Sequence, residues 1–249
     1  MALQKYNNSL SVLLKPSSVD PFLPAKMNWK EGNSFSYEQA WTMSVFAHLA
    51  YYREEALKLH LSKMACELKG FYNAKGNHAF IAQHKDNLIL SFRGTEVDIR
   101  NYYTDINFVL TDFEGAKVHK GFLSAFNSLW PKLEAQIKSL NYSKLYITGH
   151  SLGAALALLS GTQVDADIYT FGAPKTGNET FVEKFNGSPV YRIVNADDPI
   201  PSLPPSLLSF RHAGNYIQLG ERSKALALQF KDHSPINYSI ALSNHITNS

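Results

Sequence analysis

Ser151 lies at the centre of a Gly-X-Ser-X-Gly string that runs from Gly149 to Gly153. The run before this string, residues 144–148, is mostly apolar, and the run after it is rich in Ala and Leu. This pattern predicts a strand, a sharp turn and a helix, with the serine at the apex. Such a turn exposes the hydroxyl and points the positive end of the helix at an oxyanion formed beside it. The string alone would also fit a glycine-serine loop, but the flanking runs favour a nucleophile of acyl transfer.

A nucleophilic serine needs a base to take its proton, and a carboxylate to orient that base. In hydrolases with this kind of turn, the acid and then the base follow the serine along the chain. Asp197 and Asp198 come directly after a predicted strand, at the edge where the serine should lie, whereas Asp165 and Asp167 begin the preceding strand. Chain order does not show whether Asp197 or Asp198 is the catalytic acid. Both aspartates could instead cap the turn that follows the strand.

Three histidines follow these acids, and histidine is the usual base because its ordinary pKa lies near neutrality. His245 is close to the C-terminus, and His212 leads into a predicted strand. His233 lies in a loop between the last predicted strand and a final helix, so it is the better candidate for the base. The earlier histidines are predicted to be hydrogen-bonded polar residues or surface groups; they are His48, His60, His78, His84, His119 and His150.

Strands that alternate with helices predict an α/β fold with a largely parallel sheet and ligands at the carboxyl ends of the strands. Helices are expected from Tyr37, over 54–68, over 121–140 with Pro131 kinking or dividing it, over 178–185, and after His233. A hairpin is expected over 79–92, and further strands over 167–171, 190–195 and 215–219.

The composition of the 249 residues sets wide limits on function. The chain carries 24 basic and 21 acidic residues, so a net charge of +3 gives no case for nucleic acid binding. Cys66 is the sole cysteine, which excludes an internal disulfide and a thiolate metal cluster. We expect no metal and no cofactor.

We expect a single domain over 1–249, with an N-terminal arm at about 1–34 that is rich in Ser, Pro and Asn. The longest apolar run near the N-terminus, Val12 to Leu14, is too short for a signal-peptide core. The expected location is therefore the cytoplasm, or export without a recognisable signal peptide.

Four strings resemble the class 3 lipases, the family of the fungal triacylglycerol lipases. They occur in the family's order, and the likeness extends roughly from residue 37 to residue 240. Many hydrolases share the serine string, whereas the full set is specific to this family. The strings are Phe92-Arg93-Gly94-Thr95, Val118-His119-Lys120-Gly121-Phe122, Gly149-His150-Ser151-Leu152-Gly153-Ala154-Ala155 and Asn195-Ala196-Asp197-Asp198-Pro199-Ile200-Pro201-Ser202-Leu203-Pro204-Pro205.

The resemblance implies an α/β-hydrolase fold, with a mostly parallel central sheet flanked by helices. In the family, the catalytic Asp stands two residues before an apolar residue and a proline, which selects Asp198. The family's catalytic His lies in a loop near the C-terminus with an aromatic residue soon after it, which selects His233 with Tyr238.

For the oxyanion hole, the resemblance implies Thr95 together with the backbone N–H of Leu152. One departure limits the comparison, because the secreted fungal relatives carry disulfides and a chain with only Cys66 does not. Their extracellular setting therefore does not transfer.

These observations predict a lipase or esterase that hydrolyses carboxylic ester bonds of acylglycerols or related lipids through a Ser-His-Asp triad and an acyl-enzyme. The expected partners are the lipid or ester substrate and, transiently, lipid interfaces. Two alternatives stay open: a phospholipase or acyltransferase with the same triad, and a non-catalytic binding protein on the same scaffold. The oligomeric state is not predicted.

Two apolar segments have alternative interpretations. Residues 96–117 fit either a mobile lid over the serine or a fixed segment packed on the core. The stretch from Leu203 to Phe210 fits either the lining of an acyl pocket or ordinary hydrophobic packing.

Overall fold

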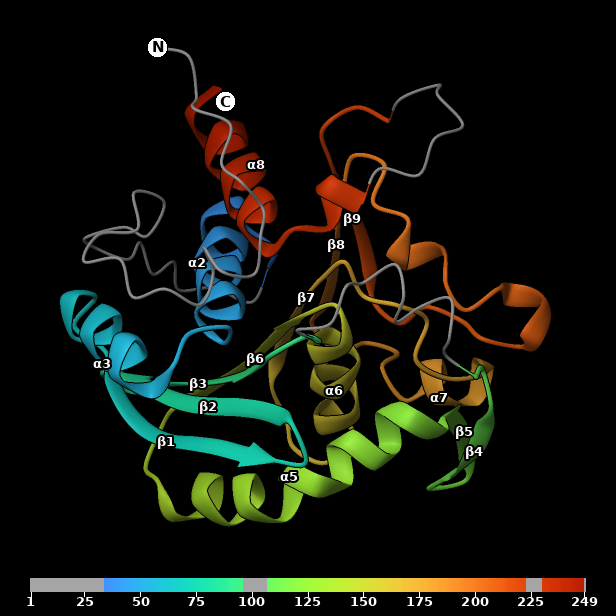
Figure 1. Ribbon diagram of the computed structural model, residues 1–249, viewed down its shortest axis with the longest axis horizontal. Helices are drawn as coiled ribbons and strands as arrows, with labels where there is room; N and C mark the ends of the chain where they lie inside the picture. Colours follow the sequence, from blue (N-terminus) through green and yellow to red (C-terminus); the bar gives the residue numbers. More distant parts are fainter. Residues whose placement is uncertain (1–33, 96–106, 223–229, 249) are drawn as a thin grey trace.

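The computed structural model describes residues 34–95, 107–222 and 230–248, and a seven-stranded sheet lies at their centre (Figure 1). The strands follow one another in space in the order β1 (Glu67–Ala74), β2 (Asn77–His84), β3 (Asn87–Phe92), β6 (Lys144–His150), β7 (Asp167–Phe171), β8 (Val190–Asn195) and β9 (Asn215–Leu219). The first three strands pair antiparallel, and the pairs from β3 to β9 are parallel. The predicted α/β fold with a mostly parallel sheet is confirmed.

The register brings the carboxyl ends of the parallel strands to one edge. Phe92 lies opposite Gly149, His150 opposite Phe171, and Asn195 opposite Leu219. The segments that follow β3, β6, β7 and β8 therefore begin side by side, as expected for a ligand site at this edge.

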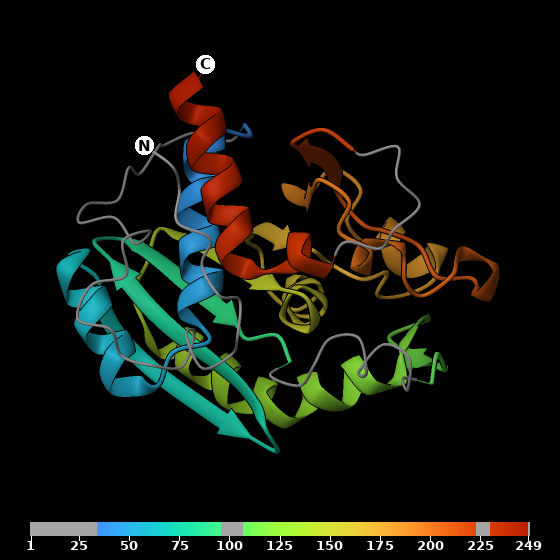
Figure 2. The ribbon, with the colours of Figure 1, turned by 45° about the horizontal axis from the view of Figure 1, so that its top comes forward.

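Helices cover both faces of the sheet (Figures 1 and 2). One face packs against α2 (Tyr37–Leu49), α3 (Glu54–Lys63) and α8 (Pro235–Asn248), and the other against α5 (Lys120–Ser139) and α6 (Leu152–Gly161). The short helix α7 (Glu179–Glu183) lies between β7 and β8 in the chain. Apolar side chains fill both layers, so each sheet face has its own core.

Helix α2 shows how tightly the layers are joined. Ser36 caps its start by accepting the N–H of Gln39 at 3.1 Å. The hydroxyls of Ser91 and Thr148, on β3 and β6, donate to carbonyls of α2 at 2.9 and 3.2 Å. Buried strand hydroxyls are thus satisfied by the helix, which fixes α2 against the centre of the sheet.

Most predicted elements are present, and the predicted helix over 54–68 is wrong in its second half. The helix ends at Lys63, Ala65 takes a positive φ of 54°, and the chain enters the edge strand β1 at Glu67. This strand is only partly buried on both faces, so its sequence lacks the clear alternation that marks a strand. Pro131 does not divide α5, which continues through it as one helix of 20 residues.

Residues 110–119 form a second, two-stranded sheet of β4 (Leu110–Phe113) and β5 (Ala116–His119), which the sequence did not predict. The N–H of His119 donates to Thr176, and the N–H of Asn178 donates to Lys117, so this hairpin is bonded to the segment after β7. The fixed alternative therefore applies to this half of the 96–117 segment. Residues 96–106, where a lid was considered, lie outside the described residues.

The N-terminal arm expected over 1–34 lies, apart from Ser34, outside the described residues. In the ranges that are described, no helix is both long enough and apolar enough to cross a lipid bilayer. The expectation of a single domain stays a prediction.

Candidate active site

Ser151 occupies the sharp turn between β6 and α6. Its φ of 59° and ψ of −126° are unusual for a residue with a side chain, as expected for an exposed nucleophile at a strained turn. A Cβ on Gly149 would come within 2.3 Å of the Gly153 backbone, and one on Gly153 within 2.3 Å of the carbonyl oxygen of Phe92. Only glycine fits at either position, and the predicted strand-turn-helix unit is confirmed.

Asp198 and His233 meet beside this turn. His233 Nδ1 lies 2.8 Å from Asp198 Oδ2, and the Asp198 side chain is fully buried. The other carboxylate oxygen, Oδ1, accepts the N–H of Ile200 at 2.9 Å. Because a carboxylate only accepts, His233 Nδ1 carries the proton and Nε2 is left as the basic nitrogen.

Asp197, the other acid that the chain order allowed, points elsewhere. Its carboxylate lies 3.9 Å from the guanidinium of Arg222, and its N–H donates to the Asp232 carboxylate at 3.3 Å. The structure therefore pairs His233 with Asp198, the residue that the family resemblance selected.

Gly172, directly after β7, is the point around which the three candidate residues gather. The N–H of Ser151 donates to the carbonyl of Phe171 at 3.0 Å, which ties the turn to the residue before this glycine. A Cβ on Gly172 would lie 2.7 Å from Asp198 Oδ2 and 2.9 Å from the His233 ring. Gly172 also has a φ of +59°, so glycine is required both by conformation and by space. The sequence analysis did not single out this residue.

Two polar atoms at this point have no hydrogen-bond partner among the described residues: Ser151 Oγ and His233 Nε2, and both are buried. Buried polar groups are nearly always paired, so unpaired ones call for an explanation such as a catalytic role. A hydroxyl and a basic nitrogen are the two atoms that proton transfer in acyl chemistry requires.

The candidate oxyanion residues are Leu152, which directly follows the serine, and Thr95, which comes after β3. Leu152 is the first residue of α6, where the N–H groups have no carbonyl of their own helix to bind. Thr95 is half-buried and follows Gly94, whose Cβ, if present, would lie 3.1 Å from the Ser151 Cβ. Strand β3 thus ends directly against the serine turn.

Tyr238, on α8, adds a third hydrogen bond to the acid. Its hydroxyl donates to Asp198 Oδ2 at 2.5 Å, and the side chain is fully buried. Burial, and then the negative charge of Asp198, raises the pKa of Tyr238 well above its ordinary value of 10. The hydroxyl therefore stays protonated at neutral and moderately alkaline pH and continues to donate.

We expect Tyr238→Phe to lower kcat by about tenfold with little change in KM, because a hydrogen bond to a charged group is worth roughly 1.5–3 kcal/mol. Steady-state ester hydrolysis measures both constants. Tyr169→Phe is the matched control, since Tyr169 is equally buried on the same face of the sheet but contacts Tyr191 instead of the acid. Equal kcat values in the two variants would contradict a role for the Tyr238 hydroxyl.

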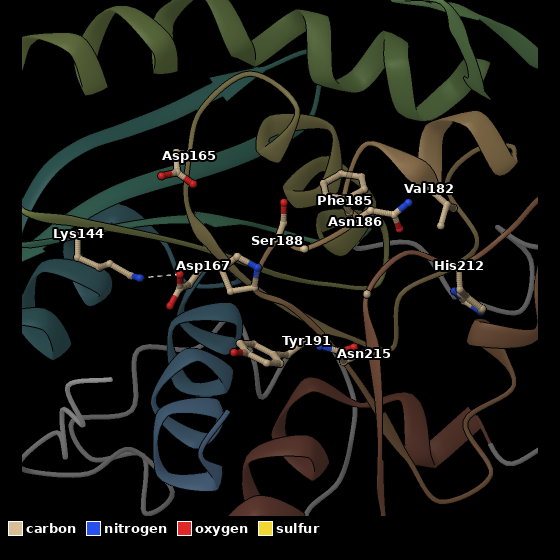
Figure 3. Close-up of a pocket in the computed structure, with 13 residues that line it drawn as sticks. Lys144, Asp165, Asp167, Val182, Phe185, Asn186, Ser188, Tyr191, His212 and Asn215 are labelled. Carbon is tan, nitrogen blue, oxygen red and sulfur yellow. Dashed lines mark ion pairs between the residues drawn. The ribbon is translucent and has the colours of Figure 1, made fainter. Parts of the chain in front are cut away.

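The remaining candidates lie away from the serine. His212 Nε2 bonds the carbonyl of Pro201 at 2.7 Å, and the ring of His245 contacts that of Tyr37 with their centroids 3.8 Å apart. Asp165 and Asp167 line a cavity of about 750 Å³ where the strands begin, and Asp167 pairs with Lys144 at 2.7 Å (Figure 3). Their predicted position at the wrong end of the sheet is confirmed.

The apolar stretch from Leu203 to Phe210, which follows the acid, is partly buried and partly exposed in the structure. Phe210 is fully buried, and its ring lies 6.0 Å from that of His119. Leu207 is 94% exposed and Leu208 is 44% exposed, so these two side chains neither pack on the core nor line an enclosed pocket. Hydrophobic packing therefore describes only one end of this stretch.

Within the described ranges, no group of three or more His, Cys, Asp or Glu side chains is arranged to hold a metal ion. Cys66 is buried, and burial raises the pKa of its thiol to about 12, so it is not a thiolate at neutral pH. The expectation that catalysis needs no metal or cofactor stays a prediction.

His150 and Tyr51 are the polar residues near the site whose placement the sequence did not predict. His150 was grouped with ordinary polar histidines, yet its ring lies 4.4 Å from that of His233 and bonds both Tyr51 and the His233 backbone. The one available signal was its position next to Ser151. Tyr51 lies between α2 and α3 in the chain, and no pattern there pointed to the serine.

Comparison with known proteins finds similarity to lipases. The lipase of Rhizopus niveus is 37% identical over 146 residues, which cover 51% of this chain and 37% of that lipase. The secreted mono- and diacylglycerol lipase 1 of Fusarium solani is 33% identical over 140 residues, covering 50% of this chain and 41% of that protein. The chain thus spans less than half the length of these two curated relatives.

Solved structures show the same fold over more of the chain. Lipase II from Rhizopus niveus has a TM-score of 0.65 at 25% identity, over 78% of this chain and 92% of that one. A triacylglycerol lipase described as having a serine protease triad at its catalytic centre has a TM-score of 0.66 at 26% identity, over 76% of this chain and 82% of its own. Residues 89–208 match the family model for class 3 lipases, and they include the serine turn and the acid. The chain is thus similar to the class 3 lipases over the part that carries the serine turn and the acid.

Proposed function

We propose that this chain hydrolyses carboxylic ester bonds of acylglycerols or related lipids through an acyl-enzyme on Ser151. His233 is the base, Asp198 orients it, and the N–H groups of Thr95 and Leu152 hold the oxyanion. The observation that carries the proposal is the convergence of a strained serine, an unpaired imidazole nitrogen and a buried carboxylate around Gly172.

The reaction follows from the proton positions. His233 Nε2 takes the Ser151 proton as the oxygen attacks the ester carbonyl, and the imidazolium that forms is stabilised by Asp198. The negative charge on the former carbonyl oxygen lies at the start of α6, where unpaired N–H groups and the helix dipole favour an anion. His233 then protonates the leaving alcohol, and in the second half it activates the water that releases the acid.

The substrate class rests on the relatives. The curated relatives are named as lipases, one of them as a mono- and diacylglycerol lipase, and a structural relative as a triacylglycerol lipase. We extend this to the present chain as lipid or ester substrates, with transient contact with lipid interfaces. Two leucines exposed at 207 and 208, on the segment after the acid, fit such contact.

A fluorophosphonate probe tests the nucleophile directly, because it bonds only to an activated serine. We expect one adduct per chain, located on Ser151 by mass spectrometry of its peptides. A protein that takes up no probe while it remains folded would favour the non-catalytic alternative.

A substrate panel then separates the enzymatic alternatives. We expect hydrolysis of monoacyl-, diacyl- or triacylglycerols and of simple esters of graded chain length. Faster release of fatty acid from phospholipid than from any acylglycerol would identify a phospholipase instead, and transfer of the acyl group to an added alcohol in preference to water would identify an acyltransferase.

A further inference from the structure

His150 joins the serine turn directly to the loop that carries the base. The side chain is buried, with 2% of the residue exposed. Its Nε2 lies 2.5 Å from the carbonyl oxygen of His233, and its Nδ1 lies 2.8 Å from the hydroxyl of Tyr51. The partners are 83 and 99 residues away along the chain, so these bonds exist only in the folded protein.

The proton positions on this ring follow from its partners. A backbone carbonyl only accepts, so His150 Nε2 carries a hydrogen and donates it to His233. Burial, and then the charge of His233, lowers the pKa of His150 well below its ordinary 6.5, so the ring is neutral and holds a single proton. Nδ1 is then an acceptor, and Tyr51 donates its O–H to it.

We propose that His150 is a positioning residue for the catalytic base, acting through the hydrogen bond from its Nε2 to the carbonyl oxygen of His233. This inference rests on the proposed function. The role is distinct from that of Asp198, which orients the imidazole of His233, because His150 holds the backbone from which that imidazole extends.

The base needs such support because no strand of the sheet holds it. His233 is the last residue of a short 3-10 helix, Phe230–His233, between β9 and α8. Apart from the bond of the His233 ring to Asp198, three hydrogen bonds between described residues tie this turn to the sheet edge. The His150 ring bonds the carbonyl of His233, the Asn195 side chain donates to the carbonyl of Asp232 at 3.0 Å, and the N–H of Asp197 donates to the Asp232 carboxylate at 3.3 Å. A displacement of about 1 Å at a reacting group can cost roughly 100-fold in rate.

The neutral state of His150 also favours proton transfer from Ser151 to His233. The two rings are 4.4 Å apart, and His233 becomes positively charged each time it takes the serine proton. A second positive charge at that distance in a buried site would oppose the transfer, because like charges repel more strongly where water is excluded. A neutral donor supports the backbone without this penalty.

Two substitutions of similar chemistry separate the role of each ring nitrogen. In His150→Gln, the side-chain amide nitrogen reaches about as far as Nε2 and still donates to His233. In His150→Asn, the amide reaches only as far as Nδ1, so the His233 carbonyl loses its donor. We expect Asn to lower kcat by about 10- to 100-fold with KM unchanged, and Gln to restore kcat to within about fivefold of wild type.

His212→Asn controls for the loss of a histidine that bonds a backbone carbonyl, because the half-buried His212 makes the same kind of Nε2 bond, to the carbonyl of Pro201. We expect it to lower the melting temperature but not kcat. Equal losses of kcat in His150→Gln and His150→Asn, or a wild-type kcat in His150→Asn, would overturn the proposal.

If the position-150 variants do not fold, Tyr51→Phe provides a second test. It removes the O–H that holds Nδ1 but leaves the ring of His150 in place, and we expect kcat to fall about three- to tenfold at constant KM. An unchanged kcat would overturn the proposal. The proposed function itself fails separately, if the protein has no esterase activity or keeps it without the Ser151 hydroxyl.

Discussion

Replacing Ser151 by alanine is expected to lower kcat for ester hydrolysis by about a million-fold, the size of loss seen when the nucleophile of a serine triad is removed. No other described hydroxyl occupies a strained turn at a helix start beside an unpaired imidazole nitrogen. The alanine side chain needs no hydrogen bond, and Ser151 Oγ makes none with the described residues, so the fold should be unaffected.

The measurement is initial rate with a chromogenic ester, alongside circular dichroism and the melting temperature. Ser160→Ala is the matched control, because Ser160 is also buried, lies on the same helix α6, and donates its hydroxyl only to the carbonyl of Leu156. We expect the control to keep wild-type kcat. Substantial turnover by Ser151→Ala would refute the assigned nucleophile.

The substitution Asp198→Asn is expected to lower kcat by about 10⁴-fold, because an amide cannot hold the histidine in the tautomer that leaves Nε2 basic. Asp198 Oδ2 accepts from both His233 and Tyr238, and an Asn NH₂ in that place would face two donors. Binding of substrate should change much less, so the loss should appear in kcat and not in KM.

Asp197→Asn is the control that the sequence itself suggests. The two aspartates are adjacent and equally suited by chain order, but the Asp197 carboxylate faces Arg222 and only Asp198 contacts His233. We expect Asp197→Asn to keep kcat within about threefold of wild type, since an ion pair of this length near the surface contributes little. The reverse result, with Asp197 essential and Asp198 replaceable, would show that the acid is misassigned.

Local patterns were sufficient for the parts of this protein that depend on neighbours in the sequence. The apolar run before Gly149 and the Ala-rich run after Gly153 required the strand-turn-helix unit, because glycine alone fits where that strand and helix meet. Strands β7 and β8 were recognisable since burial leaves their sequences mostly apolar. The partly buried edge strand β1 gave no such signal, and its first two residues were assigned to the preceding helix.

By itself, the sequence determined a mostly parallel α/β sheet, a serine at a sharp turn, and a short list of acids and bases at the right edge. Only the tertiary structure decided which side chains are in contact. Asp198 bonds His233, Tyr238 bonds the same carboxylate, and His150, next to the serine in the chain, bonds the backbone of His233. These contacts join residues 35 to 83 positions apart in the chain, and periodicity carries no information over such separations. They arise because the parallel strands end at one edge, so that segments distant in sequence are packed around Gly172.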